Sequence, residues 1–190
     1  KDIITRLLQY AHPDKYAGYV TTVEVNELVE DTLELIKHLR QENSIKITLD
    51  LTATQMIEIN PQELQQVLVN LLVNAIHALP EEGGEIILRS CDWKQQGITI
   101  CVIDNGKGIE KDSLKQIFNP FFSTKGQGEG TGLGLSISYG LIQRYGGKII
   151  AESELGKGSE FSIWLLSEPK MMEDEEAIAE QLRVIEEGVI

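Results

Sequence analysis

Five glycines occupy every second position from 126 to 134, within the stretch NPFFSTKGQGEGTGLGLSI at residues 119–137. This alternation leaves no apolar repeat to bury, so the glycine run itself forms neither an amphipathic helix nor a half-buried strand. Glycine permits left-handed dihedrals, from which successive N–H groups converge on an anion. The last glycines lead into an apolar helical pattern, and a helix N-terminus also offers free N–H groups. The stretch predicts a phosphate-binding loop; the alternative is a surface loop without a ligand.

Other common phosphate-binding motifs are absent from the chain. The sequence contains neither G-x-x-x-x-G-K-[ST] nor a strict G-x-G-x-x-G. Lys125 stands directly before the glycines and would supply a cation for a terminal phosphate. If the loop binds phosphate, it therefore does so in another way than a Walker loop or a dinucleotide fingerprint.

A second candidate group lies on the helix predicted over residues 61–79. Asn70, Asn74 and His77 are spaced i, i+4 and i+7, so they share one face of that helix. Apolar residues point elsewhere on the helix, among them Leu71, Leu72, Ala75 and Ile76. Two neutral amides are a weak magnesium site unless a nucleotide triphosphate supplies further ligands. An ordinary exposed polar face explains the spacing equally well.

A third candidate group is the stretch VIDNGKGI at residues 102–109. Asp104 closes an apolar strand, and a carboxylate that emerges from a buried strand needs a donor. Gly106 and Gly108 let the backbone turn sharply and approach a flat ligand closely. The stretch is either a plain Asp-Asn-Gly turn or a site where Asp104 accepts the exocyclic amine of adenine.

The order of predicted elements indicates an α+β two-layer sandwich, with a mixed, mostly antiparallel sheet and helices on one face. Helices are predicted from Asn26, a candidate N-cap, to about residue 39, and over 61–79, 113–118 and 134–145. Strands are predicted over 44–51, 56–60, 85–93, 97–104, 148–154 and 160–166. Regular alternation of strand and helix is absent, which argues against a Rossmann sheet.

The sequence predicts that the chain is divided into four segments. Residues 1–12 carry a helical apolar stripe stopped by Pro13 and read as the end of a longer helix, so we expect the chain to be part of a longer protein. Residues 13–23 read as a linker, and 24–167 as the domain. Residues 168–190 form an acidic, helical extension, which is either a solvated helix or a link to a further domain.

Charge and cysteine content exclude several classes of function. The formal net charge of −13 argues against non-specific binding to nucleic acid and against direct contact with an anionic membrane surface. No apolar run approaches the roughly 20 residues of a membrane helix. Cys91 and Cys101 are expected to be free thiols in a reducing, cytoplasmic compartment. Whether the parent protein is anchored in a membrane stays open.

Four motifs, taken in their order along the chain, resemble the N, G1, F and G2 boxes of the catalytic domain of sensor histidine kinases. These motifs are Asn-x-x-x-Asn, D-x-G-x-G, NPFFSTK and G-x-G-x-G. The resemblance runs from about residue 20 to 166 and implies the Bergerat fold with ATP and Mg²⁺ as ligands. It implies nucleotide contacts from Asn70, Asn74, His77, Asp104, Gly106, Gly108, Phe118, Lys125, Gly130, Thr131, Gly132, Leu133, Gly134 and Leu135.

The resemblance also implies roles within that set. Asn74 corresponds to the magnesium ligand, Asp104 to the adenine-reading residue, and Asn70 and Lys125 complete the catalytic group. The three phenylalanines Phe118, Phe121 and Phe122 correspond to the F box, which anchors the lid over the nucleotide. Two departures stand out: Ala78 replaces an aromatic that stacks on adenine in some members, and Asn60 replaces an Asp that is common before the proline.

The resemblance implies transfer of the γ-phosphate of ATP to a histidine on a dimerisation domain of the same protein, in a homodimer that signals to a response regulator receiver domain. His12, His38 and His77 do not fit the acceptor motif, so we expect that histidine outside this chain. Related ATPases carry a Glu where this chain has Asn70, which disfavours a hydrolase. A serine kinase of the anti-sigma type and a non-catalytic nucleotide-binding regulator remain alternatives.

Overall fold

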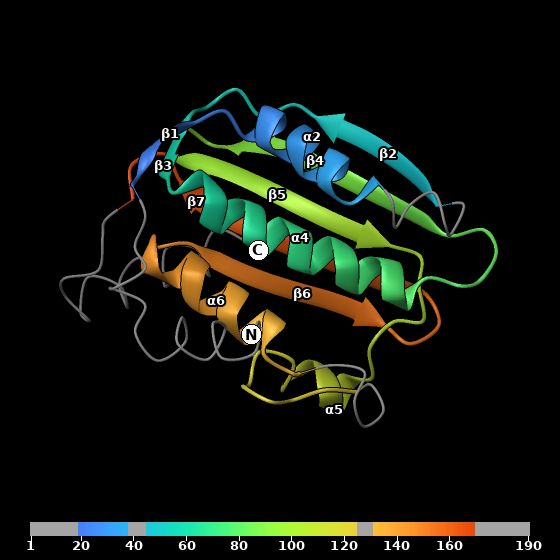
Figure 1. Ribbon diagram of the computed structural model, residues 1–190. Coiled ribbons are helices and arrows are strands. Elements are labelled where there is room, and N and C mark those ends of the chain that lie inside the picture. Colours follow the sequence, from blue (N-terminus) through green and yellow to red (C-terminus); the bar gives the residue numbers. More distant parts are fainter. Residues whose placement is uncertain (1–18, 38–44, 125–130, 170–190) are drawn as a thin grey trace.

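A five-stranded sheet, covered on one face by three helices, forms the body of the protein (Figure 1). The computed structural model describes residues 19–37, 45–124 and 131–169. The strand order is β2 (Lys46–Leu51), β4 (Glu85–Trp93), β5 (Gly97–Asp104), β7 (Gly158–Leu166) and β6 (Lys148–Glu154). Only the β2–β4 pair is parallel, and the other three pairs of this sheet are antiparallel. The predicted α+β sandwich with a mostly antiparallel sheet is therefore confirmed.

The covering helices are α2 (Val25–Leu35), α4 (Pro61–Ala78) and α6 (Gly134–Arg144). Helix α4 begins at a strong N-terminal signal: Asn60 Oδ1 accepts hydrogen bonds from the amides of Gln62 at 2.9 Å and Glu63 at 3.4 Å, and Pro61 follows the cap. One stripe of α4 is almost fully buried in the core, namely Leu64, Val67, Leu68, Leu71 and Leu72. The opposite stripe of α4 is thereby left to face the functional cavity described below.

The N-cap predicted for the first described helix was wrong. Glu24 caps α2, because its carboxylate accepts hydrogen bonds from the amides of Asn26 at 3.0 Å and Glu27 at 2.8 Å. Asn26 lies in the first turn and faces the sheet instead. Its amide donates to the carbonyl of Ala53 at 2.8 Å and accepts from the hydroxyl of Ser90 at 2.6 Å, so it ties α2 to the sheet.

Two strands pair in a way that the sequence did not predict. Strand β1 (Thr21–Val23) falls within the segment read as a linker, and it pairs antiparallel with β3 (Ile57–Ile59) in a separate two-stranded sheet. The short helix α5 (Lys111–Leu114) also starts and ends earlier than predicted. It ends early because the amides of Gln116 and Asn119 bond to carbonyls three residues back, as in tight turns. The predicted segment 1–12 lies outside the described residues, and so does the predicted extension 168–190 except for its first two residues.

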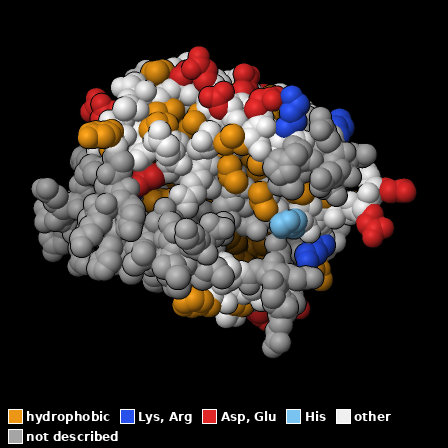
Figure 2. Space-filling model, in the orientation of Figure 1, with side chains coloured by type: hydrophobic (Ala, Val, Ile, Leu, Met, Phe, Trp, Pro, Cys, Tyr) orange, Lys and Arg blue, Asp and Glu red, His pale blue; other side chains and the backbone are white. Residues whose placement is uncertain are grey.

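Acidic side chains are scattered over the face seen in Figure 2, and no continuous basic patch forms on its described part. Both cysteines are free thiols, as predicted. Within the described ranges, no helix has the length and apolar character needed to span a membrane, and no group of His, Cys, Asp and Glu is placed to hold a metal ion.

Candidate functional site

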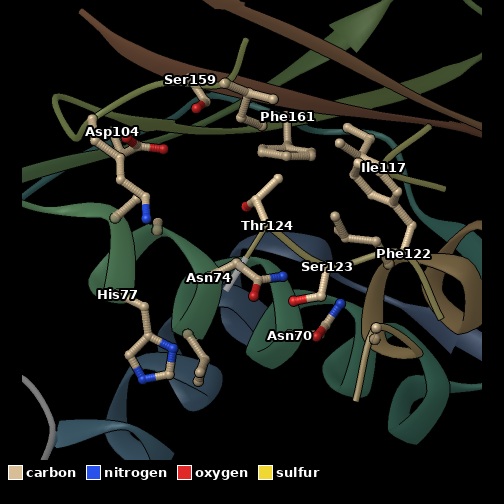
Figure 3. A pocket seen from close by; sticks show the side chains of 18 of the residues that line it. Asn70, Asn74, His77, Asp104, Ile117, Phe122, Ser123, Thr124, Ser159 and Phe161 are labelled. Carbon is tan, nitrogen blue, oxygen red and sulfur yellow. The ribbon is translucent and has the colours of Figure 1, made fainter. Parts of the chain in front are cut away.

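A cavity of about 260 Å³ lies between α4, the end of β5 and the start of α6 (Figure 3). One wall comes from the polar face of α4 and another from the loop after β5. Its lining residues are Asn70, Val73, Asn74, Ala75, His77, Ala78, Asp104, Lys107, Gly108, Ile109, Ile117, Phe122, Ser123, Thr124, Thr131, Gly132, Gly134, Leu135, Ser159 and Phe161. The three motifs that are far apart in the sequence therefore meet around one space.

Asp104 occupies the sheet side of the cavity. It is the last residue of β5, pairs with Ser159 of β7, and is 6% exposed. Its Oδ1 accepts a hydrogen bond from the amide of Gly106 at 2.8 Å. Burial raises the pKa of the Asp104 carboxyl above its ordinary value, while hydrogen bonds from the backbone amides of Gly106 and Ser159 act in the opposite direction. A carboxylate held in this way favours a ligand that brings an N–H donor.

The two predicted glycines after Asp104 have different roles. Gly108 lines the cavity at φ +68°, and a Cβ there would lie 2.1 Å from the carbonyl oxygen of Glu154. Gly106 does not line the cavity. A Cβ on Gly106 would lie 2.4 Å from the carbonyl oxygen of Ala78, so its absence lets the loop pack against the end of α4. Gly106 therefore shapes the wall, and Gly108 forms part of it.

The polar stripe of α4 faces the cavity. Asn70, Asn74 and His77 all line it, and Figure 3 shows Asn74 and His77 on α4 across from Asp104 on the sheet side. The side-chain amide of Asn70 donates from Nδ2 to Ser138 Oγ of α6 at 2.9 Å. The stripe thus presents amide groups and an imidazole along one side of the space.

The start of α6 closes the far end of the cavity. Thr131, Gly132, Gly134 and Leu135 line it, whereas Leu133 is 1% exposed and packs into the interior. Among the described residues, no side chain caps the N-terminus of α6. Its first N–H groups therefore remain available to an anion, and the helix dipole adds partial positive charge there. Lys125 and Gly130, which were predicted to act at this end, lie outside the described residues.

The F-box phenylalanines differ in their placement. Phe122 lines the cavity. Phe118 does not: its ring packs against Tyr139 of α6, with the two centroids 5.2 Å apart, because the turn after α5 directs it toward that helix. Phe121 is 67% exposed at φ +66°, and its amide donates to the carbonyl of Gly132 at 2.9 Å. Phe118 and Phe121 therefore support the wall of the cavity rather than line it.

Several lining residues were not predicted from the sequence. Lys107 is the one Lys or Arg among the described lining residues, and its position between Gly106 and Gly108 was the signal that could have identified it. Ser159 and Phe161 reach the cavity from β7 through the pairing of that strand with β5. Because that pairing joins segments more than fifty residues apart, no local pattern pointed to them.

The arrangement has distinct chemistry at its two ends. A buried carboxylate at one end suits a flat heterocycle with an amine donor, and the apolar side chains of Ile109 and Phe161 suit the faces of such a ring. Amides and an uncapped helix N-terminus at the other end suit an anion, with or without a hydrated cation. The cavity therefore fits a molecule that joins an aminated ring to a chain of phosphates.

Comparisons with known proteins agree with this geometry. Residues 59–169 match the family model described as "Histidine kinase-, DNA gyrase B-, and HSP90-like ATPase". The chain is 38% identical over 166 residues to sensor histidine kinase ZraS of Escherichia coli K12, covering 86% of this chain and 34% of ZraS. It is 36% identical over 166 residues to sporulation kinase E of Bacillus subtilis 168, covering 87% of this chain and 22% of that kinase.

Solved structures give the same result. The catalytic domain of histidine kinase ThkA matches with a TM-score of 0.70 and 31% identity, over 79% of this chain and 97% of that domain. ThkA in complex with response regulator protein TrrA matches with a TM-score of 0.71 and 27% identity, over 87% of this chain and 47% of ThkA. The chain thus corresponds to nearly all of one solved catalytic domain, but to about a third or less of the curated relatives described above.

Proposed function

The chain belongs to the family of histidine kinase-, DNA gyrase B- and HSP90-like ATPases, and on that premise we propose that it is the catalytic ATP-binding domain of a sensor histidine kinase. One observation carries the proposal: a buried carboxylate and an uncapped helix N-terminus lie at opposite ends of a single cavity. The acceptor histidine would come from a dimerisation domain of the same protein, beyond this chain.

Asp104 is the residue that reads the base. Its carboxylate accepts the exocyclic amine of adenine, an amine that guanine lacks at that position. Burial makes this contact selective, because a base without the donor leaves a desolvated carboxylate unpaired. Ser159 lies beside Asp104 in the strand pair and provides a second polar group at this end. Ala78 lines the cavity with a small side chain, so no aromatic stacks on the base from that position.

The other end of the cavity holds the triphosphate. The first N–H groups of α6 would face the phosphates, and Lys107 adds a positive charge to the lining of the same cavity, in a chain whose net charge of −13 otherwise repels phosphate. The amide oxygens of Asn70 and Asn74 fit a magnesium ion that keeps most of its waters and also binds phosphate oxygens. Magnesium supplies charge neutralisation at the phosphates, and Asn74 is its proposed ligand. Lys125 and Gly130, which lie outside the described residues, are proposed from the sequence alone to contact the phosphates.

Transfer rather than hydrolysis follows from the residue at position 70. Asn70 has no basic group at neutral pH, so it does not deprotonate an attacking water as a carboxylate would. In the proposed reaction a ring nitrogen of the acceptor histidine bonds to the γ-phosphorus, the bond to the β–γ bridging oxygen breaks, ADP leaves, and the histidine loses a proton. The domain contributes positioning and charge stabilisation.

The partners and location follow from the same proposal. A dimerisation domain presents the histidine, and a receiver domain takes the phosphoryl group onward; ThkA, a structural neighbour, was solved with response regulator TrrA. Since ATP is the substrate, we expect the domain to work in the cytoplasm as part of a homodimeric protein.

Mixing the purified chain with a separately prepared dimerisation domain and γ-labelled ATP tests the proposal. Label on that domain that is stable to base and labile to acid is the expected result for phosphohistidine. ATP binding without transfer would instead indicate a nucleotide-binding regulator. Steady phosphate release alone would indicate an ATPase, and label stable to acid on a protein partner would indicate a serine kinase.

A further inference from the structure

A buried serine on α6 contacts the functional stripe of α4. Ser138 is 2% exposed, and its Oγ lies 2.9 Å from Nδ2 of Asn70, a residue 68 positions away in the sequence. The neighbouring buried serine behaves differently: the hydroxyl of Ser136 donates to the carbonyl of Leu133 at 3.0 Å, within its own helical turn. Ser138 is therefore the serine of this helix that reaches a side chain lining the cavity.

This contact distinguishes the two ends of the Asn70 amide. A side-chain amide has a donor end and an acceptor end, and because Nδ2 of Asn70 donates to the Ser138 hydroxyl, Oδ1 is left as the free acceptor. The acceptor, Oδ1, is then directed at the first turn of α6, where a Cβ on Gly134 would lie only 2.3 Å from it. Both Asn70 and Gly134 line the cavity, so the acceptor lies at the end assigned above to the phosphates.

We propose that Ser138 is a positioning residue, whose hydroxyl holds the Asn70 amide so that Oδ1 stays the acceptor presented to the magnesium–triphosphate end of the cavity. The inference rests on the proposed function. Without the hydroxyl, the amide is free to rotate and present its N–H donors there instead, which suits phosphate oxygens but not a hydrated cation. The role of Ser138 is therefore tied to the cation and not to ATP alone.

A purely structural role of Ser138 predicts a different result. A buried hydrogen bond between α4 and α6 stabilises the fold whether or not a ligand is bound. Its loss would lower the midpoint of thermal unfolding and leave the magnesium dependence of ATP binding as it was. The positioning role changes that dependence and acts only through Asn70.

A double-mutant cycle separates the two roles, with ATP affinity measured by calorimetry in the presence and absence of Mg²⁺. Ser138→Ala should weaken ATP binding about fivefold with Mg²⁺, the size expected for one lost hydrogen bond, and much less without it. In an Asn70→Ala background the same change should have no further effect. Ser136→Ala is the matched control, a buried serine of the same helix, and should leave ATP affinity unchanged.

A second variant keeps the test valid if Ser138→Ala folds poorly. Ser138→Cys retains the volume of the site and offers a weaker acceptor, so it should show the same magnesium-dependent loss in smaller measure. The inference is overturned if Ser138→Ala or Ser138→Cys binds Mg-ATP as the wild type does, or if the loss persists in the Asn70→Ala background. A wild-type chain that binds no ATP would overturn the proposed function, and this inference with it.

Discussion

Two glycines of the same helix give the sharpest test of the site. Gly140 lies within α6, and no described atom outside its own stretch of helix lies within 4 Å of the position that a Cβ would take there. A Cβ on Gly134 would instead lie 2.3 Å from Asn70 Oδ1. Alanine is preferred over glycine in a helix by up to about 1 kcal/mol. Gly140→Ala should therefore stabilise the protein, raising the unfolding midpoint by about 1–4 °C for a chain of this size.

Gly134→Ala should leave the fold intact but damage the site. The atom in the way is the end of a side chain, so the Asn70 amide moves by about 1 Å to reach ordinary contact distance, and a displacement of that size in a reacting site costs about a hundredfold in rate. The movement also breaks the 2.9 Å hydrogen bond to Ser138, a loss of about 1 kcal/mol that offsets the gain in helix propensity. The unfolding midpoint should thus stay within about 2 °C of the wild type.

The assay pairs thermal unfolding with transfer of labelled phosphate to a separately prepared dimerisation domain. The expected pattern is a stabilised, fully active Gly140→Ala and an equally folded, nearly inactive Gly134→Ala. A Gly134→Ala variant with wild-type transfer would refute the assignment of Asn70 Oδ1 to the reacting end of the cavity. An inactive Gly140→Ala would show that helix stiffness, and not the contact with Asn70, controls the rate.

Three further predictions concern the adenine end, the cation and the core. Asp104→Asn should weaken ATP binding by about 1–3 kcal/mol in calorimetry. Burial raises the pKa of the Asp104 carboxyl above its ordinary 3.8, so the contribution of Asp104 to stability is full below pH 3.8 and is lost as the pH rises through the raised pKa. ATP affinity should show the opposite trend and fall as the pH drops through the raised pKa. Asp104→Asn should show neither trend. Asn74→Ala should abolish the effect of Mg²⁺ on ATP affinity, and a variant that keeps that effect would exclude Asn74 as the ligand. Arg144→Met should destabilise the fold by about 3–5 kcal/mol in denaturant unfolding, because it leaves the buried Glu63 carboxylate without its ion-pair partner. The control is Lys37→Met at the exposed pair with Glu34, which should change stability by less than about 1 kcal/mol. Equal effects of these two substitutions would contradict the buried placement of the Glu63–Arg144 pair.

Local patterns in the sequence were enough to predict most of the elements. The apolar stripe of α4 and the signal at Asn60 and Pro61 specify that helix by themselves, and apolar strand patterns joined by polar turns predict the two hairpins. The candidate site was predictable to the same extent. Asn70 and Asn74 lie one turn apart, and Asp104 follows a buried strand, so each piece depends on residues close together in the chain.

Contacts between distant segments were not predictable in this way. The pairing of β1 with β3, the cap at Glu24 in place of Asn26, and the turn of Phe118 toward Tyr139 each depend on which neighbours the fold supplies. The same holds for Ser159 and Phe161, which reach the cavity only through the register of β7 with β5.

Local patterns in the chain specified most of the elements, the two-layer class and many of the chemical groups of the site, because periodicity and glycine positions act over a few residues. The orientation of those groups came from the fold. Asp104 is buried, Ser138 holds the donor end of the Asn70 amide, and Gly134 leaves room for the acceptor end. Orientation depends on packing between α4, α6 and the sheet, and packing is set by side chains that are far apart along the chain.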